Sequence, residues 1–262
     1  SLAKAIAVEV LTPGMVRKLL PSRPPDAHKG TFGKALVVAG SVNYTGAAYL
    51  ASAAAARVGT GLVTLALAGS LHPILASKLT EVTFFLLPES LGVIARDAAK
   101  LLADLTPKYD ALLLGPGLGQ DPVTIEFVHS FLRLEDKEGR RPRIGFHLET
   151  PGANLMEGST GLPPLVIDAD GLNALAKTSR GWESLSKGNV LTPHPGEMSR
   201  LAEISIEEIE ADRIGLVKRL AEEWQQIIVL KGAYTLIASP QGQVAINPFA
   251  NPGLATAGTG DV

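Results

Sequence analysis

Cysteine is missing from all 262 residues of the chain, which excludes disulfides, thiolate zinc sites and a thiol nucleophile, and which suits a reducing compartment. Charge of one sign is also lacking, because the formal net charge is -2, so an electrostatic interaction with nucleic acid is not indicated. The apolar runs stop well short of the roughly 18 residues that cross a bilayer. We therefore expect a soluble, cytoplasmic protein with a small-molecule partner, and with neither nucleic acid nor a membrane as partner.

Short apolar runs alternate with helical patterns along most of the chain. We expect helices over 47–59, 70–79 and 91–105, and a strand that ends at the glycines of 115–119. Other predicted strands cover 34–41, 61–67, 83–88, 165–170, 189–194, 226–232 and 234–239.

The predicted strands at 165–170, 189–194 and 226–232 are almost continuously apolar, as in strands that are covered on both faces. The segment 229–248 instead holds short strands separated by turns, which is typical of an antiparallel meander. The pattern predicts an α/β fold with a mostly parallel central sheet, helices on both faces and an antiparallel edge near the C-terminus. We expect one large domain over 25–262, preceded by a proline-containing lead-in over 1–24.

Polar or glycine-rich segments follow several predicted strands, where ligands bind in open α/β sheets. They read AGSVNYTGAA, GPGLG, DADGLN, TPHPGE and AGTGD. The segment HKGTFGK (28–34) invites comparison with a Walker A loop, but its loop length and final residue do not match that motif, and we exclude it.

The segment AGTGD (257–261) carries the strongest signal for chemistry. Phosphoryl transfer needs fixed donors on the moving phosphoryl group and a base near the attacking hydroxyl. Backbone N–H groups of Gly258, Thr259 and Gly260 could form such an anion hole, and Asp261 could accept the proton. The alternative is that Asp261 only caps a helix after a flexible loop.

Other segments leave two interpretations open. The GPGLG loop (115–119) could let a phosphate approach the backbone, or form a tight turn. Asp168 could hold a metal ion through water or position a phosphate-binding loop, whereas Asp170 is better explained as a helix cap. His194 lies between two prolines that fix its direction, which favours a binding contact. Glu197 could bind magnesium through water or simply favour a helix N-terminus.

The remaining histidines carry less information. His72 and His129 lie in helical patterns, where surface or packing roles explain them better than catalysis. His147 lies in a poorly patterned, arginine-rich segment, and its role is left open.

Taken together, these segments resemble the NAD(P)H-hydrate dehydratase family of the ribokinase-like superfamily. The resemblance covers about residues 25 to 262 and rests on ordered blocks, which include HKGTFGKALVVAGS, LLLGPGLG, VIDADGLNAL, VLTPHPGEMSRL, VLKGAYTLI and NPGLATAGTGDV. It implies a ribokinase-like fold and the dehydration of the S-epimer of NADHX or NADPHX to NADH or NADPH. This repair reaction would use ADP, or less commonly ATP, with Mg²⁺.

The resemblance also implies roles for individual residues. Asp261 would be the base, with Gly258, Thr259 and Gly260 donating to the phosphoryl group. Ala47, Gly117, His194 and Asp261 would contact the hydrated dinucleotide. The nucleotide would bind at Lys231, Gly232, Ala233, Tyr234 and Thr235, together with Gly260.

Family members continue past GTGD, so the domain is expected to be truncated at Val262. The lead-in resembles the junction of bifunctional repair enzymes, in which an epimerase domain comes first. The resemblance further suggests a homo-oligomer, namely a tetramer.

Two other functions remain as alternatives. A ribokinase-like kinase of a small vitamin-type alcohol would share the GTGD segment, but would not explain HKGTFGK beside TPHPGE. A non-catalytic nucleotide-binding module would bind ADP without turnover and would be unaffected by Asp261→Asn.

Overall fold

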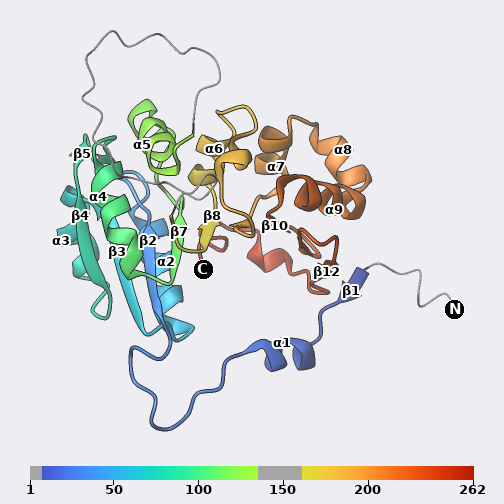
Figure 1. Ribbon diagram of the computed structural model, residues 1–262, viewed down its shortest axis with the longest axis horizontal. Helices are drawn as coiled ribbons and strands as arrows, with labels where there is room; N and C mark the ends of the chain where they lie inside the picture. Colours follow the sequence, from blue (N-terminus) through green and yellow to red (C-terminus); the bar gives the residue numbers. More distant parts are fainter. Residues whose placement is uncertain (1–7, 135–160) are drawn as a thin grey trace, which may run out of the picture.

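The computed structural model describes residues 8–134 and 161–262, and its main feature is a ten-stranded sheet (Figure 1). The strand order is β1-β12-β11-β10-β9-β8-β7-β2-β3-β4, and the strands from β10 to β4 run parallel. The bounds are β1 (Val8–Val10), β2 (Lys34–Val38), β3 (Leu62–Ala68), β4 (Thr83–Leu87), β7 (Ala111–Leu114), β8 (Leu165–Ile167), β9 (Val190–Leu191), β10 (Ile227–Leu230), β11 (Leu236–Ala238) and β12 (Val244–Ile246). The mostly parallel sheet predicted from the sequence is confirmed.

Helices cover both faces of this sheet, as predicted. The α-helices of the described residues are α1 (Pro13–Leu19), α2 (Thr45–Arg57), α3 (His72–Ala76), α4 (Ala98–Leu105), α5 (Pro122–Leu132), α6 (Asp170–Leu175), α7 (Pro195–Ala202), α8 (Ile206–Ala211) and α9 (Arg213–Trp224). The alanine-rich α2 packs on β2 and β3, because its small side chains at Ala48 and Ala51 allow a close approach. Near the other end of the sheet, α9 packs on β10 and β11.

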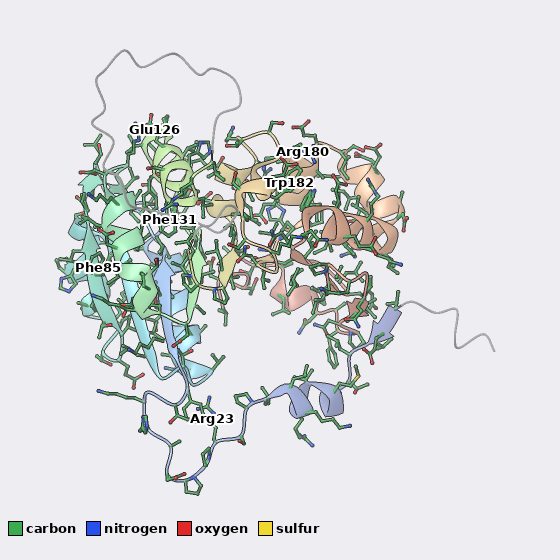
Figure 2. All side chains as sticks on the ribbon, in the orientation of Figure 1. Arg23, Phe85, Glu126, Phe131, Arg180 and Trp182 are labelled. Atoms are coloured by element: carbon green, nitrogen blue, oxygen red, sulfur yellow. The ribbon has the colours of Figure 1, made fainter. Side chains whose placement is uncertain are left out.

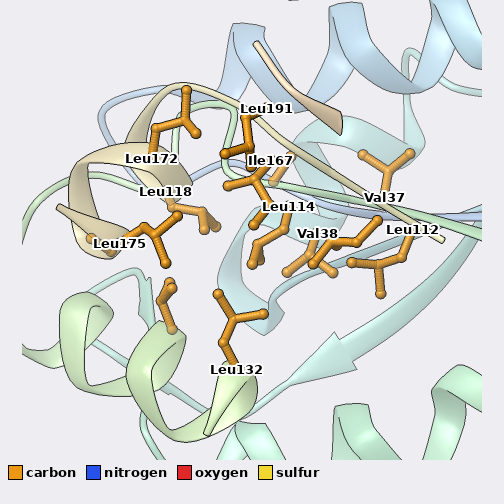
Figure 3. Close-up of a cluster of buried hydrophobic side chains, with 14 of the residues drawn as sticks. Val37, Val38, Leu112, Leu114, Leu118, Leu132, Ile167, Leu172, Leu175 and Leu191 are labelled. Atoms are coloured by element: carbon orange, nitrogen blue, oxygen red, sulfur yellow. The ribbon is translucent and has the colours of Figure 1, made fainter. Parts of the chain in front are cut away.

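The core lies between the central strands and the helices beside them. Figure 3 shows Val38, Leu114 and Ile167 from β2, β7 and β8 meeting Leu132 of α5 and Leu175 of α6. All five side chains are fully buried. Each such side chain stabilises the fold by roughly 1.5–3 kcal/mol through burial, so the carboxyl ends of these strands have a rigid support.

The antiparallel edge predicted near the C-terminus is also present. Strands β11 and β12 each pair antiparallel with the strand before them, so residues 227–246 form a meander. Beyond β12 lies β1, which pairs with it in parallel through Val8, Glu9 and Val10. The segment predicted as a lead-in therefore contributes the outermost strand of the sheet.

The rest of that lead-in crosses below the sheet in Figure 1 and meets the domain again near Arg23. The guanidinium of Arg23, labelled in Figure 2, donates to the carbonyl oxygens of Val58 and Gly59 at 3.1 and 3.0 Å. It also lies 4.1 Å from the ring centre of Phe32. By contrast, α1 buries no residue.

The helix predicted over 91–105 is wrong in its first half. Residues 89–94 form a small hairpin of β5 (Glu89–Ser90) and β6 (Val93–Ile94), and the helix begins only at Ala98. Leu91 and Gly92, at φ 51° and 80°, are both left-handed and form the hairpin turn. The apolar periodicity of LGVIARDAAKLL conceals this turn, because Ile94 is buried whether it belongs to a strand or a helix.

In residues 8–134 and 161–262, the helices are too short or too polar to cross a membrane.

Candidate active site

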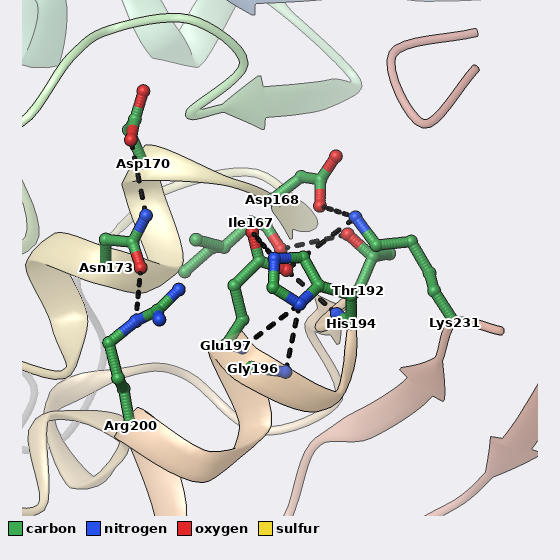
Figure 4. A network of polar contacts seen from close by, with 10 residues as sticks. All are labelled: Ile167, Asp168, Asp170, Asn173, Thr192, His194, Gly196, Glu197, Arg200 and Lys231. Carbon is green, nitrogen blue, oxygen red and sulfur yellow. Dashed lines mark hydrogen bonds and ion pairs between the residues drawn. The ribbon is translucent and has the colours of Figure 1, made fainter. Parts of the chain in front are cut away.

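Lys231, which directly follows β10, is the centre of a group of charged side chains. Its ammonium lies 2.6 Å from Oδ1 of Asp168, which follows β8, and 3.8 Å from Oε2 of Glu197 in α7. Figure 4 shows these side chains converging from three neighbouring elements. Asp168 and Glu197 are both buried, so the lysine supplies the positive charge that two carboxylates removed from water require.

Asp261 lies beside this group. Burial raises its pKa above the ordinary aspartate value, the Asp168 carboxylate raises it further, Lys231 lowers it and Asp170 raises it again. With its pKa raised in this way, Asp261 is a stronger proton acceptor than an exposed aspartate once it is ionised. This property suits the base predicted from the sequence.

The glycine segment before Asp261 forms turns rather than the start of a helix. The N–H of Asp261 donates to the carbonyl oxygen of Gly258 at 3.2 Å. The hydroxyl of Thr259 lies 2.8 Å from the carbonyl oxygens of both Leu254 and Thr256, so this side chain holds its own loop. In the described part of the chain, Gly258 to Gly260 lie in turns.

Helix α2 supports the loops on one side of the site. A Cβ on Gly258 would lie 2.8 Å from Cδ1 of Leu50, and a Cβ on Gly117 would lie 2.7 Å from Cβ of Ala47. Ala47 and Gly117, both predicted to contact the dinucleotide, are thus direct neighbours. Gly117 also has a φ of 65°, so glycine is required there for space and for backbone conformation.

The predicted nucleotide segment lines a pocket of about 610 Å³. Lys231, Gly232, Ala233 and Thr235 form one wall, and Thr259 and Gly260 form another. A Cβ on Gly260 would lie 3.8 Å from the ammonium of Lys231, so the two walls meet at this lysine. Tyr234 is the exception, because it is exposed, has a φ of 56° and does not line the pocket.

His194 and Glu197 form a capping box at the start of α7. Nδ1 of His194 accepts from the N–H groups of Gly196 and Glu197 at 3.0 and 3.3 Å, and Oε2 of Glu197 accepts from the N–H of His194 at 2.8 Å. The sequence indicates a helix-terminal role as one alternative for Glu197, whereas this role of His194 was not predicted. With Nδ1 accepting, the half-exposed ring presents Nε2 as its donor, 3.4 Å from Oε1 of Glu197.

Asp170 does not cap a helix, so that interpretation is wrong. Helix α6 begins at Asp170 itself, and its N-cap residue, Ala169, makes no side-chain cap. Instead, Oδ2 of Asp170 accepts from the N–H of Gly119 at 2.8 Å, which ties the GPGLG loop to α6.

A family model described as NAD(P)H-hydrate dehydratase matches residues 35–137 and 152–262, and it therefore covers all of these segments. The chain belongs to the NAD(P)H-hydrate dehydratase family.

Relatives in this family differ in length. The chain is 42% identical over 254 residues to a bifunctional NAD(P)H-hydrate repair enzyme from Moorella thermoacetica. The matched region covers 97% of this chain and 43% of that protein. It is 34% identical over 248 residues to an ADP-dependent (S)-NAD(P)H-hydrate dehydratase from Bacillus subtilis, covering 94% of this chain and 75% of that enzyme. The chain thus spans less than half of the bifunctional relative.

Solved structures agree with this assignment. An ADP/ATP-dependent NAD(P)H-hydrate dehydratase from B. subtilis, co-crystallised with ATP and Mg²⁺, has a TM-score of 0.73 at 33% identity and covers 97% of this chain and 77% of its own. A ribokinase-like superfamily protein from Enterococcus faecalis has a TM-score of 0.72 at 24% identity, covering 97% of this chain and 76% of its own. The ribokinase-like fold predicted from the sequence is confirmed.

Nothing in the sequence distinguished Arg213 as a neighbour of the predicted nucleotide segment. At the start of α9, its Nη1 donates to the carbonyl oxygen of Ala233, a residue of the predicted nucleotide segment, at 3.0 Å. Its Nε and Nη2 are buried without a hydrogen-bond partner in the described chain. Only proximity in the fold identifies this residue, because it is 20 positions from Ala233 in a helix that carries several other charges.

Among the histidines, His72 packs edge-on against Phe84. Nε2 of His129 lies 2.9 Å from the carbonyl oxygen of Ala174, which gives His129 a structural contact. His147 lies outside the described residues.

Proposed function

We propose that the chain dehydrates the S-epimer of NADHX or NADPHX to NADH or NADPH by phosphorylating the ring hydroxyl and then losing phosphate. The observation that carries this proposal is the position of Asp261 beside Asp168, Asp170 and Lys231, at the end of the loop that lines the pocket of the predicted nucleotide segment. This position supports the proposal that Asp261 acts as the general base beside the phosphoryl donor.

The reaction proceeds in two stages in this site. Asp261 accepts the proton of the ring hydroxyl while the hydroxyl oxygen attacks the terminal phosphorus of the nucleotide. When ADP is the donor, AMP is the leaving group. The ring nitrogen's electron pair then expels the phosphate, and loss of a proton from the neighbouring carbon restores the double bond. Because hydroxide is a poor leaving group and phosphate a good one, the nucleotide supplies the driving force.

The nucleotide donor is proposed to be ADP. Two relatives, from B. subtilis and Neisseria meningitidis, are ADP-dependent (S)-NAD(P)H-hydrate dehydratases. The pocket fits such a ligand, because backbone-rich walls at 232–233 and 259–260 can approach phosphates closely and Lys231 adds a positive charge.

Magnesium is proposed as the ion on the phosphates, as in the B. subtilis enzyme co-crystallised with ATP and Mg²⁺. Among the described residues, no three His, Asp or Glu side chains are grouped closely enough to hold a metal ion alone. This fits Mg²⁺ bound mainly by phosphate and water, with Glu197 interacting through water. The tetramer and the cytoplasmic location stay predictions.

Recovery of reduced nicotinamide tests the proposal. The full-length protein is mixed with hydrated NADH, Mg²⁺ and either ADP or ATP, and the near-ultraviolet absorbance is followed. We expect recovery that requires nucleotide and falls by roughly 10²–10⁴-fold in Asp261→Asn. Asp97→Asn serves as a matched control, because Asp97 is exposed and its side chain makes no cap hydrogen bond. Intact nucleotide binding without recovery would contradict the proposal and favour a kinase of another alcohol.

A further inference from the structure

A line of hydrogen bonds crosses the site from α7 to the GPGLG loop. Nε of Arg200 donates to Oδ1 of Asn173 at 2.9 Å, and Nδ2 of Asn173 donates to Oδ1 of Asp170 at 3.2 Å. The other oxygen of Asp170 accepts from the N–H of Gly119 at 2.8 Å. Figure 4 shows the three side chains lying apart from the Lys231 group and linking α7 to α6.

The direction of every bond in this line is determined by its ends. Arg200 can only donate, so Asn173 must turn its oxygen toward the guanidinium and its amide nitrogen toward Asp170. The N–H of Gly119 also only donates. Asp170 therefore has to accept from both sides with a separate oxygen for each, which an aspartate can do and an asparagine of the same shape cannot.

The GPGLG loop depends on the Asp170 side chain at its C-terminal end. Its first residues are fastened by backbone bonds, since Gly115 donates to Val38 and Gly40 donates to Pro116. The N–H of Gly119 is instead held by the Asp170 side chain. With Gly115, Gly117 and Gly119 all at positive φ, the loop has little conformational preference of its own.

We propose that Asp170 is a positioning residue that, through Asn173 and Arg200, fixes the distance between the Gly117 loop and α7 and so sets the gap that accepts the hydrated nicotinamide dinucleotide. This inference rests on the proposed function and on the prediction that Gly117 and His194 contact the dinucleotide. Since α7 begins directly after His194 and carries Arg200 nearly two turns later, the line connects the two predicted contacts.

Exchanging the two side chains of the line provides the test. In Asp170→Asn the side chain has one acceptor oxygen for two donors, so either Nδ2 of Asn173 or the N–H of Gly119 loses its acceptor. In Asn173→Asp two carboxylates face each other, so each single variant breaks the line. The double variant, which carries both substitutions, restores every bond. Its carboxylate at position 173 accepts from Arg200 and from the new amide nitrogen at position 170, whose amide oxygen accepts from the N–H of Gly119. Net charge and side-chain size are the same in the double variant and the wild type.

In the full-length protein, we expect each single variant to raise KM for the hydrated dinucleotide by about tenfold, as for loss of a hydrogen bond to a charged group. The KM for the nucleotide should change by less than about twofold, and the double variant should return to within about threefold of wild type. Hydrogen exchange of the Gly119 amide should be faster in each single variant and return toward the wild-type rate in the double variant. This measurement reports on the loop without any turnover. Thermal unfolding checks that each variant is folded.

Several outcomes would overturn the inference. Unchanged KM and unchanged Gly119 exchange in Asp170→Asn would show that the line supports nothing. A double variant as impaired as the single variants would show that Asp170 acts through its own position and charge. A wild type that regenerates no reduced nicotinamide would instead refute the proposed function, and with it the ligand named here, whatever the exchange data show.

Discussion

The ammonium of Lys231 lies 2.6 Å from the carboxylate of Asp168, and it both lines the pocket of the predicted nucleotide segment and lies close to the proposed base, Asp261. The resemblance implied that Lys231 binds nucleotide, and Lys231 lines the pocket formed by the predicted nucleotide segment, but its role in binding stays a prediction. The ion pair adds a second role, because the same ammonium influences the charge of Asp261. Lys231 therefore links the donor side of the site to the base.

This arrangement predicts opposite pH shifts for two variants. The Asp168 carboxylate raises the pKa of Asp261 and Lys231 lowers it, so Asp168→Asn should lower that pKa and Lys231→Met should raise it. A base works only when it is deprotonated, so the rate falls as pH drops through its pKa. The acidic limb of kcat/KM should move to lower pH in Asp168→Asn and to higher pH in Lys231→Met. Shifts in the same direction would contradict the electrostatic account.

Gly117→Ala tests the contact between the loop and α2. A Cβ at this position would lie 2.7 Å from Cβ of Ala47 and 2.8 Å from Cβ of Tyr44, at a φ of 65°. We expect a loss of about 1–3 kcal/mol in the free energy of unfolding and a higher KM for the dinucleotide. Gly188→Ala is the control, because its φ of 82° is similar but no atom lies within 4 Å. Equal losses in both variants would mean that backbone strain alone matters.

Glu197 offers a test that separates capping from magnesium binding. Glu197→Gln keeps an acceptor for the N–H of His194, whereas Glu197→Ala removes it and should cost about 1 kcal/mol of stability. If Glu197 also interacts with Mg²⁺ through water, as proposed, the loss of charge in Glu197→Gln should raise the Mg²⁺ concentration for half-maximal activity severalfold. An unchanged requirement would leave Glu197 with the capping role alone.

Arg213→Met should weaken nucleotide binding. The variant removes the hydrogen bond to Ala233 that holds the back of the nucleotide segment, and a charged bond of this kind is worth about 1.5–3 kcal/mol. We expect KM for ADP to rise about tenfold or more, with KM for the hydrated dinucleotide nearly unchanged. Arg219→Met, at an exposed position of the same helix, should have no effect on either. Equal increases in KM for ADP and for the hydrated dinucleotide would mean that Arg213 does not act through the nucleotide segment, and would contradict this prediction.

Much of the fold could be predicted from the sequence, because strands that are buried on both faces are continuously apolar, as in LVI (165–167) and IIVL (227–230). The turn at Leu91 and Gly92 could not, since its residues continue the apolar spacing of the following helix. The pairing of β1 with β12 was also not predictable, because it joins opposite ends of the chain, with Val8 beside Val244, and nothing local in VEV indicates its partner.

The candidate site, like the fold, was predictable only in part. Glycines, prolines and acidic residues at strand ends predicted where ligands bind, and the structure places Ala47 beside Gly117 and Lys231 beside Gly260. What the sequence could not provide was the partner of each side chain. The contact of Asp170 with Gly119 spans 51 positions, and that of Lys231 with Asp168 spans 63, so both depend on the strand order.

The central claim is that the ring oxygen leaves as part of a phosphate, and isotope labelling tests it most directly. Hydrated NADH carrying oxygen-18 in its ring hydroxyl is converted with ADP and Mg²⁺, and the inorganic phosphate and water are analysed by mass spectrometry. The account predicts that the label appears in phosphate, with one phosphate released for each reduced nicotinamide. Label in water would mean that the hydroxyl leaves without being phosphorylated, and would contradict the role given to Asp261.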